Sequence, residues 1–339
     1  MRILIVKLSS LGDVVHTMPA VQDLASALPQ ARIDWVVERA FAPLAQRCAG
    51  VERVIVCDLR RWRKAPWSAA TGLQWRDFKA DLQRHDYDAI IDLQGLSKSA
   101  WVSWLARLAT GGRRYAMAHR TDGSAYEAPT RWVADVAISL ERHVHAVHRS
   151  RLLCAHALGY DLAGAPRYGL QTPVAMPVAV PVGGPPAPAD LARPCVVLAH
   201  GTSRADKQWP LEHWLELAAA LGSAGFGLAL PHGSDEEEQR SQWLAQRCRH
   251  AQVWPRLSLD ALLESMRGCA GVIGVDSGLS HMAVALGLAH VQIYNFDTAW
   301  RTGPEPAEPA LSRRQVSVYA EPTPSVESVW QAWRGVLAA

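Results

Sequence analysis

The stretch MRILIVKLSSLGDVVHTMPA, residues 1–20, decides the fold of this chain. Its run from Arg2 to Val6 is apolar and rich in β-branched residues, as expected for a strand that is buried on both faces of a parallel sheet. Small and flexible residues interrupt the run at 7–12, and a helical composition follows Asp13. A strand, a loop and a helix in this order predict an open α/β sheet, whose ligands bind beside the loops that follow the strands.

Asp13 is the first candidate functional residue because it follows this first strand. A carboxylate at this edge of the sheet reaches a bound molecule, and Gly12 lets the backbone approach that molecule closely. Asp is also a favoured residue at helix starts, so the same pattern is typical of a residue that only caps a helix. The residues alone leave both interpretations open.

Length and composition limit the class of protein. A chain of 339 residues is long enough for two domains with separate cores, and 49% hydrophobic and 20% charged residues are typical of a soluble globular protein. A net charge of +3 is too small for the global electropositive field of a nucleic-acid-binding protein. The sequence shows no apolar run of transmembrane length and no signal-peptide pattern. Six cysteines without a C-x-x-C pair then indicate reduced thiols in a cytosolic protein.

The alternation of strands and helices predicts two doubly wound parallel sheets. Strands are expected at 2–6, 33–37, 54–57, 89–93, 113–117, 195–199, 227–230, 271–275 and 290–294. Prolines and glycines gather in 166–193, which we interpret as a linker between a domain at 1–165 and a domain at 194–323. A last helix within 324–339 is expected to pack back on the first domain.

The densest basic cluster is RRWRKAPW, residues 60–67. Its four cations follow a predicted strand: Arg60, Arg61, Arg63 and Lys64. Arginine binds phosphates and carboxylates with two N–H groups, so the cluster suits a ligand that carries several such groups. Trp62 and Trp67 among the cations also suit a membrane headgroup region. An isolated basic run is equally typical of a solvated surface loop.

Other polar residues carry weaker signals. GLSKS, residues 95–99, lacks the first glycine and the spacing of a P-loop. Arg120 is the residue best able to contact an anion in the irregular stretch 118–132. His143, His145 and His148 lack the i, i+4 spacing of a helical zinc site, so we predict no metal.

The second half of the chain repeats the pattern of the first. In the loop 200–210, Thr202 and Ser203 can donate to phosphate oxygens, and Lys207 can balance the charge of a diphosphate. The acidic run 235–238 suits the first turn of a helix, and one of its carboxylates, such as Glu237, can instead accept from ribose hydroxyls.

The motif DSGLSH, residues 276–281, is the second strong signal. Asp276 ends a buried strand, and Ser277 and Gly278 open a helix. The backbone N–H groups at the helix start, among them those of Gly278 and Leu279, form a ready anion site. His281 lies one turn into the helix, where it can face the same ligand.

Together these segments resemble the lipopolysaccharide heptosyltransferases, the ADP-heptose glycosyltransferase family (glycosyltransferase family 9) with the GT-B fold. The matching segments are KLSSLGDVVHTMPA at 7–20, RRWRK at 60–64, YDAIIDLQGLSKSA at 87–100, HGTSRADKQWP at 200–210 and GVDSGLSH at 274–281. They keep one order over nearly the whole chain, which makes the combination more specific than any single motif. The loop SSLGDVVHT together with RRWRK is similar to the first type in this family rather than the second.

The resemblance implies two Rossmann-like domains with the reaction in the cleft between them. It implies ADP-heptose as the donor, bound mainly by the second domain, and the inner Kdo of Kdo2-lipid A as the acceptor, bound by the first. It implies inversion at the transferred sugar, no cofactor and no metal. It also implies a peripheral location on the cytoplasmic face of the inner membrane.

Roles for single residues follow from the same resemblance. Asp13 is the catalytic base, and Lys207 assists at the donor phosphates. The donor-binding residues are Ser9, Ser10, Gly12, Thr202, Ser203, Lys207, Glu237, Asp276, Ser277, Gly278, Leu279 and His281. The acceptor-binding residues are Arg60, Arg61, Arg63, Lys64 and Arg120. Two alternatives stay open: a transferase of this family with another acceptor, and a non-catalytic nucleotide-sugar-binding protein at the membrane.

Overall fold

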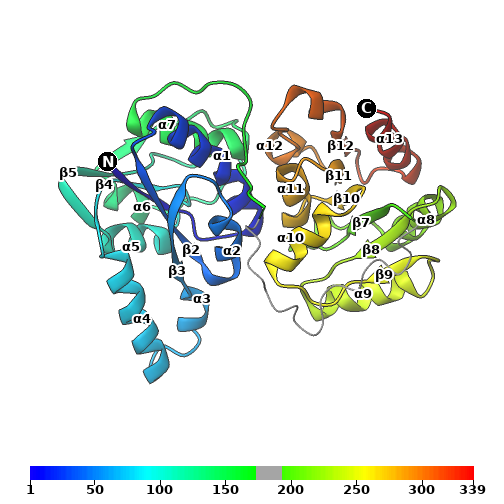
Figure 1. The fold of residues 1–339 in the computed structure, drawn as a ribbon, viewed down its shortest axis with the longest axis horizontal. Coiled ribbons are helices and arrows are strands. Elements are labelled where there is room, and N and C mark those ends of the chain that lie inside the picture. The colour runs from blue at the N-terminus through cyan, green and yellow to red at the C-terminus, as the bar shows by residue number, and fades with distance from the viewer. Residues whose placement is uncertain (173–192) are drawn as a thin grey trace. The chain divides into compact units, whose positions relative to one another are not determined.

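The computed structural model describes residues 1–172 and 193–339, and the chain divides into two compact units (Figure 1). Unit 1 spans Met1–Thr172 and unit 2 spans Pro173–Ala339. Each unit contains one six-stranded sheet, and every pair of neighbouring strands is parallel. The predicted α/β class with two doubly wound parallel sheets is confirmed.

The sheet of unit 1 is built around the first strand, in the order β3-β2-β1-β4-β5-β6. Its strands are β1 (Arg2–Val6), β2 (Arg32–Glu38), β3 (Val51–Cys57), β4 (Asp86–Asp92), β5 (Arg107–Met117) and β6 (Val136–Ile138). Residues Ile3 to Val6 are fully buried, as the continuous apolar run predicts for a central strand. The order changes direction beside β1, and this is where ligands bind in such sheets.

Two helical layers cover the sheet of unit 1. The helices are α1 (Leu11–Ala27), α2 (Ala42–Gln46), α3 (Leu59–Trp62), α4 (Ala69–Leu82), α5 (Ser97–Leu105), α6 (Pro129–Val133) and α7 (Ala146–Leu158), with a 3₁₀ turn η1 (Arg39–Phe41). Helices α1 and α7 pack together on one face (Figure 1). Phe78 of α4 and Val102 of α5 join Leu4 of β1 in the core on the other face, where α5 also packs against α6.

Residues 166–172 belong to unit 1 rather than to the predicted linker. The backbone of Gly169 accepts a hydrogen bond from Ala49 (2.8 Å), and Gln171 donates one to Arg47 (2.8 Å). The remainder of the predicted linker, residues 173–192, lies outside the described residues. Unit 1 therefore continues past the expected boundary at 165.

Unit 2 repeats the architecture with the strand order β12-β11-β10-β7-β8-β9. The strands are β7 (Cys195–Ala199), β8 (Gly227–Leu230), β9 (Ala251–Val253), β10 (Gly271–Val275), β11 (Ala289–Tyr294) and β12 (Gln315–Tyr319). The helices are α8 (Leu211–Ser223), α9 (Asp235–Ala245), α10 (Leu259–Arg267), α11 (Gly278–Ala285), α12 (Ala299–Thr302) and α13 (Val326–Ala338), with 3₁₀ turns η2 (Ala205–Lys207) and η3 (Pro309–Arg313). Gly274 lets α11 approach the sheet, because a Cβ there would lie 2.6 Å from Oγ of Ser280.

The last helix packs differently from the expectation. We expected the helix within 324–339 to pack on the first domain, but α13 buries Val329, Trp333 and Val336 in the core of unit 2. These side chains form one apolar stripe along the helix. Gly271 makes room for the indole, since a Cβ there would lie 2.8 Å from Trp333.

Candidate active site

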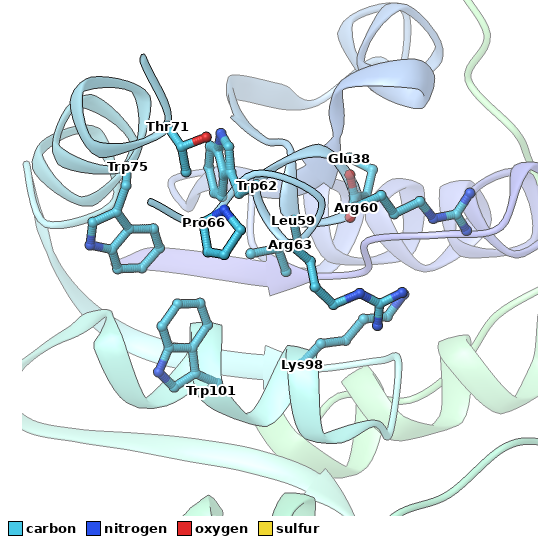
Figure 2. Close-up of a pocket in the computed structure, with 10 residues that line it drawn as sticks. All are labelled: Glu38, Leu59, Arg60, Trp62, Arg63, Pro66, Thr71, Trp75, Lys98 and Trp101. Atoms are coloured by element: carbon cyan, nitrogen blue, oxygen red, sulfur yellow. The ribbon is translucent and has the colours of Figure 1, made fainter. Parts of the chain in front are cut away.

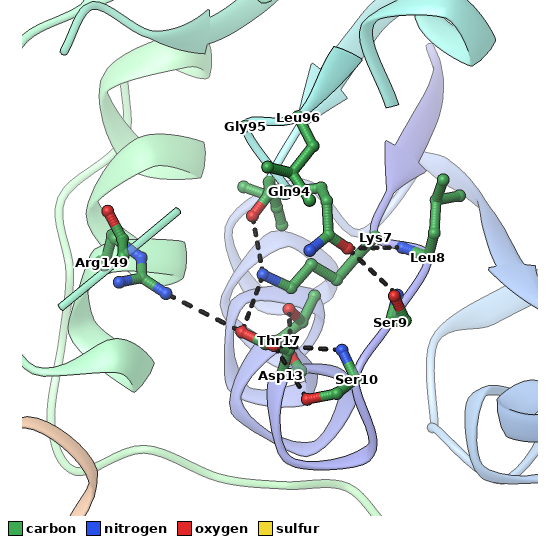
Figure 3. Close-up of polar contacts among 12 residues, drawn as sticks. Lys7, Leu8, Ser9, Ser10, Asp13, Thr17, Gln94, Gly95, Leu96 and Arg149 are labelled. Atoms are coloured by element: carbon green, nitrogen blue, oxygen red, sulfur yellow. Dashed lines mark hydrogen bonds and ion pairs between the residues drawn. The ribbon is translucent and has the colours of Figure 1, made fainter. Parts of the chain in front are cut away.

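Asp13 lies in the first turn of α1 and both caps the helix and presents its carboxylate (Figure 3). The backbone N–H and the hydroxyl of Ser10 donate to Oδ2 at 3.0 and 3.1 Å. Nζ of Lys7 lies 3.2 Å from Oδ1. The Asp13 side chain nevertheless keeps 34% of its surface exposed, whereas Lys7 keeps 2%. The capping interpretation and the ligand-facing interpretation are therefore compatible.

Two cations hold the Asp13 carboxylate in its charged form. Nη2 of Arg149, on α7, lies 4.0 Å from Oδ1 on the side away from the Ser10 bonds. Burial alone would raise the pKa of Asp13, but Lys7, the Ser10 amide and Arg149 outweigh it and lower the pKa to about 2. Burial lowers the pKa of Lys7, and the Asp13 carboxylate opposes that change. At neutral pH the site thus offers an ionised carboxylate, as a proton acceptor must.

A hydrogen-bonded turn after β4 fixes the loop that leads to Asp13. Oε1 of Gln94 accepts from the backbone N–H groups of Leu8 (3.0 Å) and Ser9 (3.1 Å). Nζ of Lys98 donates to Oγ of Ser9 at 2.9 Å. Oδ1 of Asp92 accepts from the backbone N–H of Gln94 at 2.8 Å. Burial raises the pKa of Asp92 to about 6. Ser9 therefore serves the loop itself, and its contact with a donor stays a prediction, as does that of the buried Gly12.

The basic cluster borders a pocket of about 480 Å³ in unit 1 (Figure 2). Arg60, Arg63 and Lys98 line it, while Arg61 and Lys64 are exposed and do not. Its apolar wall contains Trp62, Trp75, Trp101, Leu59 and Pro66, and the rings of Trp75 and Trp101 stack with centroids 4.7 Å apart. The pocket can hold a ligand with anionic groups at the arginines and an apolar surface against the indoles.

Glu38, at the end of β2, lines the same pocket and was missed by the sequence analysis. Its side chain is buried, and its Oε1 has no hydrogen-bond partner among residues 1–172 and 193–339. Burial raises the pKa of Glu38, and Arg60 and Lys98 oppose that change. A buried oxygen without a partner beside a pocket is an unused hydrogen-bond acceptor. The pocket thus pairs a cationic rim with one acceptor for a ligand hydroxyl.

In unit 2, the two sequence motifs at 200–210 and 276–281 meet at Asp276. Nζ of Lys207 lies 2.5 Å from Oδ2, and Nε2 of His281 lies 3.3 Å from Oδ1. Oγ1 of Thr202 donates to the backbone carbonyl of Asp276 at 3.3 Å. Burial alone would raise the pKa of Asp276, but His281 and Lys207 hold it well below its usual range. The arrangement orients Lys207 at the carboxyl end of β10.

Asn295 secures the loop that carries Lys207. Its Nδ2 donates to the backbone carbonyls of Asp206 (2.9 Å) and Gln208 (2.8 Å), which flank the lysine. Its Oδ1 accepts from Thr323 at 2.8 Å. Asn295 follows β11, and no sequence motif marked it for this role.

The start of α11 offers backbone donors beside this cluster. Ser277 precedes the helix, and its buried hydroxyl has no hydrogen-bond partner within the part of the chain that the structure describes. The N–H groups of Gly278 and Leu279 lie in the first turn, where the helix favours an anion. The Ser280 hydroxyl is already used, since it donates to the carbonyl of Val275 at 2.6 Å.

Glu237 stabilises the start of α9 and lies near the Thr202 loop. Its Oε2 accepts from the backbone N–H of Gly233 at 2.7 Å, and its own N–H donates to Ser234, so it stabilises the start of α9. It also lies against the loop after β7, because a Cβ on Gly201 would fall 2.4 Å from its Oε1. The carboxylate is therefore near the Thr202 loop, and its contact with a ribose stays a prediction.

Two predicted residues stand apart from these clusters. Nε of Arg120 donates to the carbonyl of Ser124 at 3.0 Å, and Arg120 does not line the pocket. Ser203 is exposed. Within residues 1–172 and 193–339 no group of three or more His, Cys, Asp or Glu side chains is placed to hold a metal ion. The same residues contain no helix that is long and apolar enough to cross a membrane.

A sequence model described as Glycosyltransferase family 9 (heptosyltransferase) matches residues 75–330. The chain belongs to glycosyltransferase family 9. It is 39% identical over 298 residues to Lipopolysaccharide heptosyltransferase 1 of Escherichia coli strain K12, covering 87% of this chain and 88% of that protein. The family, the enzyme class and the heptosyltransferase activity predicted from the sequence are confirmed.

Solved structures of an E. coli heptosyltransferase agree with this assignment. The E. coli heptosyltransferase WaaC with ADP has a TM-score of 0.80 and 33% identity, with 98% of both chains covered. The same enzyme with ADP-2-deoxy-2-fluoro heptose has a TM-score of 0.76 and 34% identity, again with 98% of both chains covered. The predicted GT-B heptosyltransferase fold is confirmed by this likeness.

Within this family 9 chain, sequence reasoning found Asp13, Asp276 and the two partners of Asp276, Lys207 and His281, but it missed the cations that set the charge state of Asp13. Lys7 directly follows β1 inside the first motif, and its burial could not be read from the sequence. Arg149 reaches Asp13 from α7, which no local pattern indicates. The motifs marked both acids and the partners of Asp276, whereas only the fold supplied the partners of Asp13.

Proposed function

We propose that this family 9 enzyme transfers L-glycero-D-manno-heptose from ADP-heptose to the inner Kdo of Kdo2-lipid A. The observation that carries the proposal is the Asp13 carboxylate, which Lys7 and Arg149 keep ionised while a third of its surface stays exposed. A binding protein has no need of such a base. The relatives support ADP-heptose as the donor, because they are named heptosyltransferases and the two WaaC structures contain ADP or an ADP-heptose analogue.

Asp13 acts as the general base in this proposal. The acceptor hydroxyl attacks the anomeric carbon, and its proton passes to a carboxylate oxygen of Asp13 as the new C–O bond forms. A pKa of about 2 makes Asp13 a weak base, so the transfer becomes favourable late, when bond formation has made the hydroxyl acidic. Displacement in one step inverts the anomeric configuration, and one carboxylate is then sufficient.

Lys207 and the start of α11 stabilise the departing ADP. The β-phosphate gains negative charge as the glycosidic bond breaks, and a fixed cation with helix N–H groups stabilises that charge. Asp276 holds Lys207, and Asn295 holds the backbone on both sides of it. ADP leaves as a stable anion and needs no proton. In this proposal protein groups supply the positive charge, without a cofactor or a metal.

The acceptor is bound by five cations of unit 1. Arg60, Arg61, Arg63, Lys64 and Arg120 contact its phosphates and carboxylates. The pocket beside Arg60 and Arg63 takes one of its sugars, with a hydroxyl on Glu38. Because this acceptor is a lipid, we place the enzyme peripherally on the cytoplasmic face of the inner membrane.

The test is ADP release from ADP-heptose with and without Kdo2-lipid A. We expect release only with the acceptor, and none above background with the Asp13→Asn variant. Release that is independent of the acceptor would refute the acceptor assignment. ADP binding without any release would refute transfer and favour the binding-protein alternative.

A further inference from the structure

The exposed tryptophans of unit 1 lie in one helical layer. Trp67 is 96%, Trp104 62% and Trp132 79% exposed, and Trp101 and Leu73 are also exposed. All five belong to α4, α5, α6 or the loop before α4. Among the described residues, α1, α2 and α7 on the opposite face expose no large hydrophobic side chain. We call these five residues the tryptophan face.

The members of the tryptophan face lie on adjoining elements. Trp104 follows Trp101 by one turn of α5, so both occupy one side of that helix. The ring of Trp101 stacks on Trp75 of α4, which joins the two helices (Figure 2). Helix α6, with Trp132, packs against α5. Exposed indoles on two adjoining helices and on a nearby loop are unusual on a free protein surface, because burial of indoles is favourable.

Positive charge accompanies these indoles. Residues 59–84 contain seven lysines or arginines and two aspartates, and Arg131 adjoins Trp132. Indoles suit the interface between headgroups and acyl chains, and cations next to them attract anionic lipids. We propose that the tryptophan face docks on an anionic phospholipid bilayer. This deepens the proposed function by assigning the membrane-facing surface.

The pocket adjoins this face. Trp101 belongs to both, and Pro66 at the pocket precedes the exposed Trp67. Docking through the tryptophan face thus brings Arg60 and Arg63 to the depth of lipid headgroups, where the phosphates of a membrane-embedded acceptor lie. The acceptor then enters the pocket without leaving the bilayer.

The test is co-sedimentation of the whole chain with acceptor-free vesicles of phosphatidylethanolamine and phosphatidylglycerol. The variant combines Trp67→Ser, Trp104→Ser and Trp132→Ser, all at exposed positions. We expect its partition coefficient to fall at least about tenfold, because three indoles leave the interface. The matched control, Leu337→Ser, removes an exposed apolar side chain from unit 2 and leaves binding unchanged. Raised salt weakens binding of the wild type by screening the cations.

Turnover on a deacylated, water-soluble acceptor separates docking from catalysis. The triple variant should match the wild type on this acceptor and lose rate on the same acceptor embedded in vesicles. Wild-type vesicle binding by the triple variant would overturn the proposal. A wild-type dimer that the triple variant loses would also overturn it, since a second copy would then cover the face. If the wild type binds vesicles but transfers no heptose, docking stands and the proposed function fails.

Discussion

Replacing Asp13 with Asn separates its chemical role from its structural one. The amide oxygen of Asn can still accept from the Ser10 N–H, so the helix cap is retained, while the base is removed. We expect turnover to fall by roughly 10² to 10⁴, the usual contribution of a general base. ADP affinity, measured by titration calorimetry, should not change, because Lys207 and the start of α11 lie in unit 2.

The same substitution should destabilise unit 1, because it leaves a buried Lys7 without its anion. At the Nζ–Oδ1 distance of 3.2 Å, an effective dielectric constant of about 20 gives roughly 5 kcal/mol for the attraction. Asp13 is one-third exposed, and solvent screening reduces this to about 1–3 kcal/mol of lost stability. The loss appears as a lower urea midpoint for unfolding, followed by tryptophan fluorescence.

The difference in stability between the wild type and the Asp13→Asn variant should decrease as the pH falls. The pKa of Asp13 is about 2 in the folded chain, below the value of about 3.9 for an unfolded Asp. Ionised Asp13 therefore adds stability that is fully present above the unfolded pKa and is lost as the pH falls towards 2. The urea midpoints of the wild type and the Asp13→Asn variant should converge in this window and stay apart above about pH 5.

The double variant Lys7→Met with Asp13→Asn decides between the two roles. Methionine keeps most of the lysine stem and leaves no unpaired charge, so the double variant should regain much of the lost stability. It should not regain turnover. If stability and turnover return together, Asp13 only organises the loop and the base is another group. A loss of turnover below tenfold in the single variant would refute the reasoning as well.

Three further substitutions test the rest of the site. Arg60→Ala combined with Arg61→Ala should raise the KM for the acceptor at least about tenfold and leave that for ADP-heptose unchanged, since both arginines belong to unit 1. Lys207→Met should lower kcat by roughly 10² to 10³, because it removes a fixed charge at the leaving group. Asn295→Ala should raise the KM for ADP-heptose several-fold, since two hydrogen bonds worth about 1 kcal/mol each no longer hold the Lys207 loop.

Steady-state kinetics, with each substrate varied in turn, measures the effects of these three sets of substitutions. Arg76→Ala, an exposed cation on α4 outside the pocket, is the control for the arginine pair and should behave as wild type on the soluble acceptor. An unchanged acceptor KM in the Arg60 and Arg61 variant contradicts their role. Wild-type kcat in Lys207→Met contradicts charge stabilisation, and an unchanged KM in Asn295→Ala contradicts its support of the loop.

The central strands were predictable because a strand buried on both faces needs an unbroken apolar run. The runs at β1, β7 and β10 are of this kind, and all three are fully or almost fully buried. The edge strands β6, β9 and β12 were missed. Strands β6 and β9 have only three residues each, and none of the three missed strands is buried along its whole length. Their strand pairing is decided by the neighbouring strand.

The acids of the site and the partners of Asp276 were predictable, whereas the surroundings of Asp13 and of the pocket were not. Asp13 and Asp276 follow strands whose carboxyl ends define the ligand edge, which is a local property of the sequence. The cation that approaches Asp13 from α7 and the acceptor oxygen of Glu38 depend on packing between distant segments. The tertiary fold alone brings Arg149 to Asp13.

The two units use the same kind of ion pair with the roles exchanged. In unit 1 the lysine is 2% and the aspartate 34% exposed, whereas in unit 2 the lysine is 15% and the aspartate 4% exposed. Only the more exposed member of each pair can touch a substrate, and the buried member fixes its charge and direction. In the proposed mechanism, Lys7 therefore prepares an anion for the acceptor hydroxyl, and Asp276 prepares a cation for the departing diphosphate. The opposite charges of the two accessible groups match the proton released by the nucleophile and the negative charge gained by the leaving group.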